Sequence, residues 1–244
     1  LPGKKCGCGC DQHERREDNP LAAQKNGKVF LQMRFAGNII LCILIGAEIQ
    51  VFHTEPANCS FNALDFLSKM ANLVGMRAAI LSDIHSNIQA LTKAFSIIDH
   101  SHIDEVYCLG DIVGYGANPN ECVDLIRQRA TYSILGNHDN AAVDPAQAEY
   151  FTKPGRTAAV WTNKILTPAR MDFLASLPYS FETRDITLAH ASPLNPHQWE
   201  YVLSLQIAQK QFEAFTTKLC FIGHTHVPSI CGEKLRTFLF KKDM

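Results

Sequence analysis

The sequence has almost no net charge and no basic stripe. Its 23 Lys and Arg residues nearly balance 24 Asp and Glu residues, for a formal net charge of −1. Affinity for a polyanion needs clustered positive charge. This balance therefore argues against a nucleic-acid polymer as a partner and against a nuclease acting on DNA.

Long hydrophobic runs are also absent. The most apolar stretch, residues 35–52, contains Glu48 and Gln50, and its longest uninterrupted apolar run is Ile39–Ile45. That run is far shorter than the roughly 20 residues that span a bilayer. It also lies too far from the start of the chain for a signal peptide. We expect no membrane partner and a cytoplasmic location.

The cysteines lack the spacing of a disulfide framework. There are nine of them, an odd number, and those after Met76 are scattered along the chain. The tract from Cys6 to Cys10 has no partner pair at the spacing of a zinc site. We therefore expect buried free thiols in a reducing compartment.

The pattern of the chain changes at Met76. Residues 1–34 are polar and show no periodicity, and residues 35–75 show no recurring start and stop signals. We predict that residues 1–75 are an N-terminal extension, disordered or outside the native domain, and that residues 76–244 form one domain. Only Ser229–Met244 follow the last motif, so we expect this domain to be truncated at its C-terminus.

After Met76, short apolar runs alternate with amphipathic stretches, a pattern typical of α/β proteins. The expected strands are Ala78–Leu81, Val106–Leu109, Tyr132–Leu135, Ile186–Ala189 and Leu219–Ile222. The expected helices are Asn87–Ile98, Pro119–Arg129, Thr157–Leu177 and Leu203–Phe215. Ser86 with Gln89 and Asn118 with Glu121 have the spacing of capping boxes.

Each of the five apolar runs is followed by side chains that can bind a metal. These are Asp83, His85, Asp111, Asn137, His190, His224 and His226. Ligand sites of open α/β sheets form at the carboxyl ends of the strands. Each motif alone is more typical of a turn or a cap. Together they would make a buried charged cluster that is costly without a metal to coordinate.

The residue types indicate the chemistry. Carboxylate and imidazole ligands without thiolate suit borderline divalent metals such as Mn, Fe, Co, Ni or Zn. Seven ligands are too many for one ion but fit two ions that share a carboxylate. Two ions roughly 3.5–4 Å apart can hold a bridging hydroxide and neutralise charge during phosphoryl displacement. We therefore predict a phosphoesterase with two divalent transition-metal ions, manganese first.

The ordered motifs Asp-x-His, Gly-Asp, Gly-Asn-His-Asp, His and Gly-His-Thr-His resemble those of the calcineurin-like metallophosphoesterases. The resemblance runs from about Met76 to about Pro228. It implies an α/β fold, a two-sheet sandwich flanked by helices (αββα), with the site at the strand ends.

The resemblance also assigns a role to each motif residue. One metal would be bound by Asp83, His85 and His226, the second by Asn137, His190 and His224, and both by Asp111. His138 would not be a ligand but would contact the phosphate or the leaving oxygen. The neighbouring Asp139 would orient His138.

Two positions indicate the branch of this family. Its protein phosphatases and diadenosine tetraphosphatases carry arginines, which hold a terminal phosphate, where this chain has Tyr115 and Leu135. The pattern is closer to the small bacterial phosphodiesterase-like branch, whose natural substrates are often undefined. We expect a small phosphorylated or nucleotide-like substrate. That branch usually has Gly where this chain has Ala191, a change that matters if the backbone there needs a positive φ.

Several alternatives stay open. Tyr115, Trp199 and Tyr201 either stack on a nucleobase or pack at the edge of the core. A dinucleoside polyphosphate hydrolase is the alternative activity. A non-catalytic scaffold of the same fold is the alternative outside catalysis, although such proteins typically lack the histidine that this chain keeps as His138. The sequence carries no signal for an oligomeric state.

Overall fold

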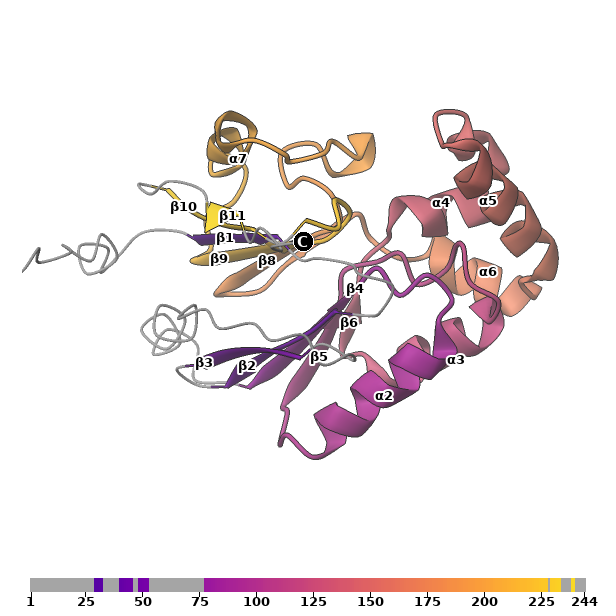
Figure 1. The fold of residues 1–244 in the computed structure, drawn as a ribbon, viewed down its shortest axis with the longest axis horizontal. Coiled ribbons are helices and arrows are strands. Elements are labelled where there is room, and N and C mark those ends of the chain that lie inside the picture. The colour runs from indigo at the N-terminus through magenta and orange to yellow at the C-terminus, as the bar shows by residue number, and fades with distance from the viewer. Residues whose placement is uncertain are drawn as a thin grey trace, which may run out of the picture.

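The computed structural model describes residues 29–32, 40–45, 48–52, 77–227, 229–233 and 238–239. Their strands form two sheets that pack as neighbouring layers, and helices cover the outer faces (Figure 1). The predicted αββα sandwich is thus confirmed. None of the helices within these ranges is long and apolar enough to cross a membrane.

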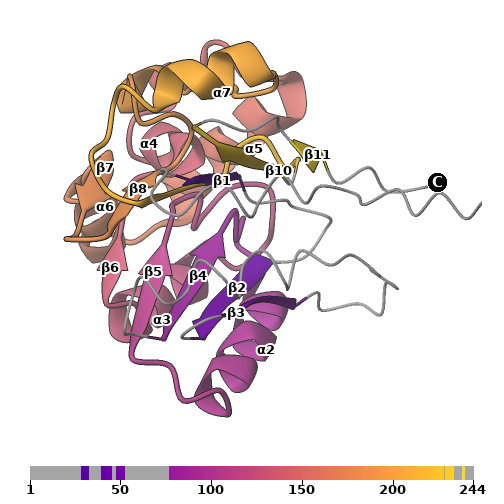
Figure 2. The ribbon, with the colours of Figure 1, turned by 90° about the vertical axis from the view of Figure 1, so that its left-hand side faces the viewer.

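The first sheet has five strands in the order β3-β2-β4-β5-β6. Its strands are β2 (Ile40–Ile45), β3 (Glu48–Phe52), β4 (Ala78–Ser82), β5 (Glu105–Cys108) and β6 (Tyr132–Ser133). The last three run parallel, whereas β2 pairs antiparallel with both β3 and β4. Two helices, α2 (Ile88–Asp99) and α3 (Pro119–Arg129), cover its outer face (Figure 2).

The second sheet has six strands in the order β11-β10-β1-β9-β8-β7. Its strands are β1 (Val29–Gln32), β7 (Ser180–Glu182), β8 (Ile186–Ala189), β9 (Leu219–Ile222), β10 (Ser229–Gly232) and β11 (Phe238–Leu239). Strand β9 runs parallel to β8 and to β1. Helix α7 (Leu205–Gln211) lies over this sheet (Figures 1 and 2).

The remaining helices connect the two sheets and gather at one end of the molecule (Figure 1). They are α4 (Asn137–Val143), the 3-10 turn η2 (Pro145–Ala148), α5 (Lys153–Ile165) and α6 (Pro168–Ala175). A further 3-10 turn, η3 (Pro196–Gln198), follows β8. The predicted single helix Thr157–Leu177 was wrong. Pro168 occupies the first turn of α6, and a proline disfavours helical backbone at the residue before it, so the helix breaks there.

The core lies on both faces of the sheets. Every residue of β4, β8 and β9 is buried, as expected for strands covered on one face by a second sheet and on the other by helices. Cys108, Cys122 and Cys220 are buried thiols whose pKa is raised by that burial. This confirms the prediction of buried thiols at these three positions.

Some local predictions were wrong in detail. The cap of α2 is Asn87, whose side-chain oxygen accepts the backbone N–H of Ala90 at 3.0 Å, rather than Ser86. Asn118 does precede α3, and Pro119 takes the first turn, but Asn118 makes no side-chain capping bond. Strand β6 is shorter than the predicted strand Tyr132–Leu135, and helix α7 is shorter than the predicted helix Leu203–Phe215. In both cases apolar residues continue into the flanking loops.

Three strands come from the segment that was predicted to be an extension. Strand β1 lies between β9 and β10, and β2 pairs with β4. The tract from Cys6 to Cys10 and residue Met76 lie outside the described residues. Whether the domain depends on residues 1–75, and whether its C-terminus is truncated, both stay predictions.

Candidate metal centre

The seven predicted ligands lie together where the central strands of both sheets end. Three groups of side chains have ligand atoms within 4.8 Å of one another. The groups are Asp83 with His85 and His226, His85 with Asp111 and His138, and Asp111 with His190 and His224. The first sheet supplies residues after β4, β5 and β6, and the second supplies residues after β8 and β9. The facing sheets therefore bring together motifs that are far apart in the sequence.

Asp111 links the groups to one another. Its Oδ2 lies 3.3 Å from Nε2 of His190 and 3.7 Å from Nε2 of His85. Its Oδ1 accepts the backbone N–H of His138 at 2.8 Å. One carboxylate oxygen thus faces an imidazole of each proposed metal position, the arrangement that a bridging ligand requires.

Asp83 organises the other side of the centre. Its Oδ1 accepts the backbone N–H of His224 at 3.1 Å and lies 3.3 Å from Nε2 of His226. Its Oδ2 accepts the hydroxyl of Ser82 at 2.6 Å. Both oxygens are therefore held in place, and the carboxylate cannot rotate without losing a hydrogen bond.

Asn137 lies between two imidazoles. Its side-chain oxygen is 3.1 Å from Nε2 of His190 and 3.0 Å from Nδ1 of His224. Nε2 of His224 is buried and has no hydrogen-bond partner. The amide oxygen thus lies between the two histidines with which it was predicted to share a metal, and the assignment to a second metal stays a prediction.

Two backbone carbonyls orient the histidine rings. Nδ1 of His190 lies 2.7 Å from the carbonyl oxygen of Leu109, and Nδ1 of His85 lies 3.2 Å from that of Val113. A carbonyl oxygen can only accept, so each Nδ1 carries the proton and donates it. In the neutral rings Nε2 then holds the lone pair, which is the arrangement usual for metal-binding histidines.

This arrangement needs a cation. In a neutral His190, the lone pair of Nε2 faces Oδ2 of Asp111 and the amide oxygen of Asn137, so three acceptor atoms meet without a proton between them. Either a proton or a metal ion must compensate them. The donor set of carboxylate, amide oxygen and imidazole fits divalent transition metals. The residues present therefore fit the predicted ions.

The pKa values of Asp111 and His190 also indicate that the cluster needs a positive charge. Burial alone would raise the pKa of Asp111, but the neighbouring histidines, His190 first, hold that pKa well below its usual value. Burial alone would lower the pKa of His190, but the carboxylate of Asp111 raises it to about 9. A proton on His190 thus compensates the negative charge of Asp111. A divalent cation bound between the two side chains would replace that proton.

Backbone strain is concentrated in the ligands. Five of the seven have a positive φ: Asp83 (56°), His85 (48°), Asp111 (53°), His224 (66°) and His226 (56°). A residue other than glycine costs on the order of 1–3 kcal/mol in such a conformation, and such residues cluster at functional sites. The fold holds these side chains in place against their local preference.

Two motif glycines are required by close approach. A Cβ at Gly136 would overlap the backbone and carboxylate of Asp111, and a Cβ at Gly223 would overlap Ser82 and Asp83. The glycine before Asn137 and the glycine before His224 thus allow strand-end loops to meet across the centre. Ala191 is not among the residues with positive φ, so its replacement of glycine introduces no backbone strain.

His138 lies beside the ligands, and its ring is held by aromatic contacts. Its centroid lies 4.5 Å from that of Tyr115, 4.7 Å from that of Phe151 and 4.9 Å from that of His85. Nδ1 is buried without a hydrogen-bond partner. Burial lowers the pKa of His138 to about 4, so its imidazole is neutral at pH 7.

Asp139 was predicted to orient His138, but its carboxylate oxygens accept backbone N–H groups instead of contacting the His138 ring. Its Oδ1 accepts the backbone N–H of Val113 at 3.0 Å, and its Oδ2 accepts that of Gly136, also at 3.0 Å. Burial, followed by the charge of Asp111, raises the pKa of Asp139 to about 7. Asp139 therefore ties the loop after β5 to the start of α4. Its effect on His138 is limited to fixing the backbone on either side of the site.

The structure shows what Tyr201 and Trp199 contact, which the sequence had left open, and two contacts that the sequence analysis missed. The Tyr201 ring stacks on His224 at a centroid distance of 4.1 Å, and the Trp199 ring meets His190 edge-on at 5.9 Å. Phe151, which packs on His138, and Ser82 were missed. The position of Ser82 before the Asp-x-His motif was a usable signal. Nothing local to Phe151 connects it with a histidine thirteen residues earlier.

Comparisons with known proteins point to one family. A family model described as the calcineurin-like phosphoesterase superfamily domain matches residues 76–240. An uncharacterised protein of Methanocaldococcus jannaschii is 39% identical over 167 residues, which cover 66% of this chain and 67% of that protein. The crystal structure of a metallophosphoesterase from Sphaerobacter thermophilus is 43% identical, with a TM-score of 0.55, over 63% of this chain. The match spans 62% of that solved chain, less than two thirds of its length.

Proposed function

Since the chain belongs to the calcineurin-like phosphoesterase superfamily, we propose that it is a metal-dependent hydrolase that cleaves phosphodiester bonds in a small substrate. The observation that carries this proposal is the shared position of Asp111. Its Oδ2 lies within 3.7 Å of Nε2 in both His85 and His190, which belong to different groups of ligand-type side chains. A single carboxylate in that position is what a pair of neighbouring ions requires.

We propose the division of ligands that the family resemblance implies. One ion would be held by Asp83, His85, Asp111 and His226, and the other by Asp111, Asn137, His190 and His224. When bound, two such ions supply positive charge to the phosphate and lower the pKa of water, which provides a nucleophile near neutral pH. Manganese is the first candidate, and a mixed set of carboxylate, amide oxygen and imidazole ligands also suits Fe, Co, Ni or Zn.

His138 would act on the substrate rather than bind an ion. The Nδ1 side of its ring is closed, because a Cβ placed on Gly114 would lie 2.6 Å from that atom. Nε2 is therefore the nitrogen available to the substrate. In the tautomer that carries the proton on Nε2, the neutral ring donates a hydrogen bond to the leaving oxygen. The negative charge that develops on this oxygen strengthens the bond and favours transfer of the proton.

The choice of a diester over a monoester rests on two side chains. Where the related protein phosphatases carry arginine, this chain has Leu135, which is buried, and Tyr115, whose ring lies 4.5 Å from that of His138. A monoester carries up to two negative charges at pH 7 and gains most from a bidentate arginine. A diester carries one negative charge and an additional organic group. It therefore suits a site in which an aromatic ring takes the place of a cation.

A screen on the metal-loaded protein tests the proposal. The full chain is reconstituted with Mn²⁺ and offered a phosphodiester, the matching phosphomonoester and a dinucleoside polyphosphate. We expect kcat/KM to be highest for the diester. Faster turnover of the dinucleoside polyphosphate would identify the alternative activity. Stoichiometric metal binding without turnover of any substrate would indicate a scaffold.

A further inference from the structure

Tyr201 forms an open aromatic surface beside the metal centre. One face of its ring stacks on His224, with an interplanar angle of 29°. The side chain is nevertheless 53% exposed. The next residue, Val202, is buried, and Ser204 caps α7 through a bond from the N–H of Ile207. The segment is thus anchored without Tyr201, whose outer face does not pack against the core.

Tyr115 occupies the equivalent place on the His138 side. It is also 53% exposed, and its centroid lies 5.0 Å from that of His85 and 4.5 Å from that of His138. Its φ of 53° is strained for a residue other than glycine. The turn is fixed by the following residue, because Gly116 donates its N–H to the carbonyl of His85 at 3.0 Å. The fold therefore holds an aromatic ring at this point at a conformational cost.

The two tyrosines contact different parts of the centre. Tyr201 lies on a ligand of the second proposed ion, and Tyr115 lies on a ligand of the first and on His138. A phosphodiester has two ester groups, one on each side of the phosphorus. If His138 assists departure of the leaving group, then Tyr115 lies on the leaving side, and Tyr201 is placed to contact the group that stays on the phosphate.

We propose that these tyrosines determine specificity, and that Tyr201 stacks on a nucleobase carried by the retained ester group while Tyr115 contacts the leaving group. This inference rests on the proposed function. A nucleobase fits because it is flat and has a π-face, which matches the open outer face of Tyr201. Stacking of a base on an aromatic side chain typically corresponds to roughly 5- to 100-fold in affinity.

Two substrates with the same leaving group isolate the role of Tyr201. Thymidine 5′-(p-nitrophenyl) phosphate and methyl p-nitrophenyl phosphate both release nitrophenolate, but only the first retains a base. We expect the Mn²⁺-loaded protein to favour the thymidine ester in kcat/KM by about tenfold or more. Tyr201→Leu should lower this ratio at least fivefold, whereas Tyr201→Phe, which keeps the stacking face, should preserve it. Tyr115→Leu should leave the ratio unchanged, because its contact is with the common leaving group.

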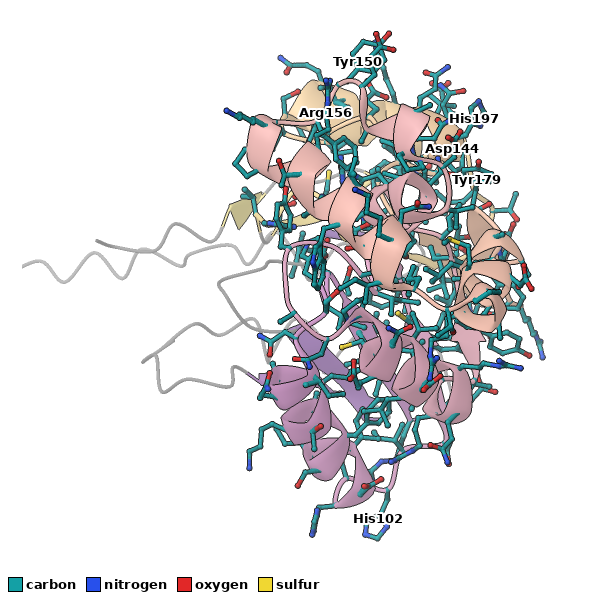
Figure 3. The ribbon with its side chains drawn as sticks, turned by 90° about the vertical axis from the view of Figure 1, so that its right-hand side faces the viewer. His102, Asp144, Tyr150, Arg156, Tyr179 and His197 are labelled. Atoms are coloured by element: carbon teal, nitrogen blue, oxygen red, sulfur yellow. The ribbon has the colours of Figure 1, made fainter. Side chains whose placement is uncertain are left out.

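A binding measurement provides a readout that is independent of turnover. Calorimetry gives the Kd of thymidine 5′-monophosphate and of 2-deoxyribose 5-phosphate, which lacks the base. Tyr201→Leu should weaken binding of the first about tenfold relative to the second. Tyr150→Leu is the matched control, since Tyr150, between η2 and α5, is 93% exposed at the outer surface (Figure 3). Metal content and Tm of each variant establish that the centre is intact.

The outcomes separate the inference from the proposed function. Equal kcat/KM for the two esters in the unaltered protein, or an unchanged ratio in Tyr201→Leu, would overturn the inference while leaving the phosphodiesterase proposal in place. Failure to turn over either ester would count against the phosphodiesterase. In that case the two Kd values still decide whether Tyr201 binds a base, since equal values would overturn the inference.

Discussion

Nε2 of His190 lies 3.3 Å from Oδ2 of Asp111, and both side chains are almost completely buried. The carbonyl of Leu109, 2.7 Å from Nδ1, fixes the ring in this orientation. The pair can therefore be stabilised in two ways, either by a proton on His190 or by a cation bound to both side chains. The second way would make the protein a metalloenzyme.

Activity is expected to depend on bound transition metal. Dialysis against a chelator should abolish phosphoesterase activity, and Mn²⁺, Co²⁺ or Ni²⁺ should restore it best, because the ligands are carboxylate, amide oxygen and imidazole. Elemental analysis of the protein before and after dialysis measures the metal content. An active preparation that contains no transition metal would contradict the assignment of the centre.

Asp111→Ala should be the most damaging single ligand substitution. Asp111 is the carboxylate that both proposed ions would share, and its removal also leaves His190 buried without its carboxylate partner, which destabilises a protein strongly. We expect at least a 100-fold loss in kcat/KM and a loss of both ions, whereas substitutions of the other ligands should retain part of the metal. Asp172→Ala, an exposed carboxylate on α6, is the control. Normal metal content in Asp111→Ala would contradict the proposal that Asp111 is a ligand of both ions.

Ser82→Ala tests the support of a ligand rather than the ligand itself. The Ser82 hydroxyl donates to Oδ2 of Asp83 at 2.6 Å, and the side chain is fully buried. Loss of such an outer contact typically weakens metal affinity or activity by roughly 10- to 100-fold. We expect a shift of that size in the Mn²⁺ dependence of activity, and no shift for the exposed Ser96→Ala. An unchanged Mn²⁺ dependence would show that Asp83 needs no help from Ser82.

His138→Asn tests whether the protein is an enzyme or only binds metal. The ring contacts Tyr115 and Phe151 and lies beside the ligands, so its removal should lower kcat by roughly 10²–10⁴-fold for a substrate with a poor leaving group. The loss should be smaller for a nitrophenyl ester, whose leaving oxygen needs less assistance. Metal content should stay normal. A lower Tm with an unchanged kcat on both substrates would assign His138 a structural role only.

A shortened chain beginning at Met76 tests the prediction that residues 1–75 are an extension. It keeps every proposed site residue, and on that prediction it should fold and bind metal. It would lose β1, β2 and β3, whose backbones pair with β9, β10, β4 and one another. Solubility, metal content and kcat of the shortened chain are compared with those of the full chain. Insolubility or loss of metal would show that residues 1–75 are part of the domain.

The main elements of the domain could be predicted because their signals are local. Buried strands appear as short apolar runs, and the helix that starts at Pro119 is marked by a proline at its first turn. The prediction of one helix failed at Pro168. There the helix-breaking effect of proline outweighs the continuous amphipathic pattern and divides it into α5 and α6. The insertion of β1 between β9 and β10 has no local signal at all, because strand pairing is a long-range relationship.

The sequence by itself determined which side chains compose the candidate centre. Each ligand type follows an apolar run, and the ends of such strands meet at one edge of a sheet, so order and spacing were sufficient. Tertiary structure alone decided how those side chains are held. The proton position on His190 follows from the carbonyl of Leu109, and Asp139 binds backbone N–H groups rather than His138. The stacking of Tyr201 on His224 likewise exists only once the loop after β8 meets the end of β9. Hydrogen bonds and ring contacts act over a few ångströms, and only the packed fold sets those distances between residues far apart in the chain.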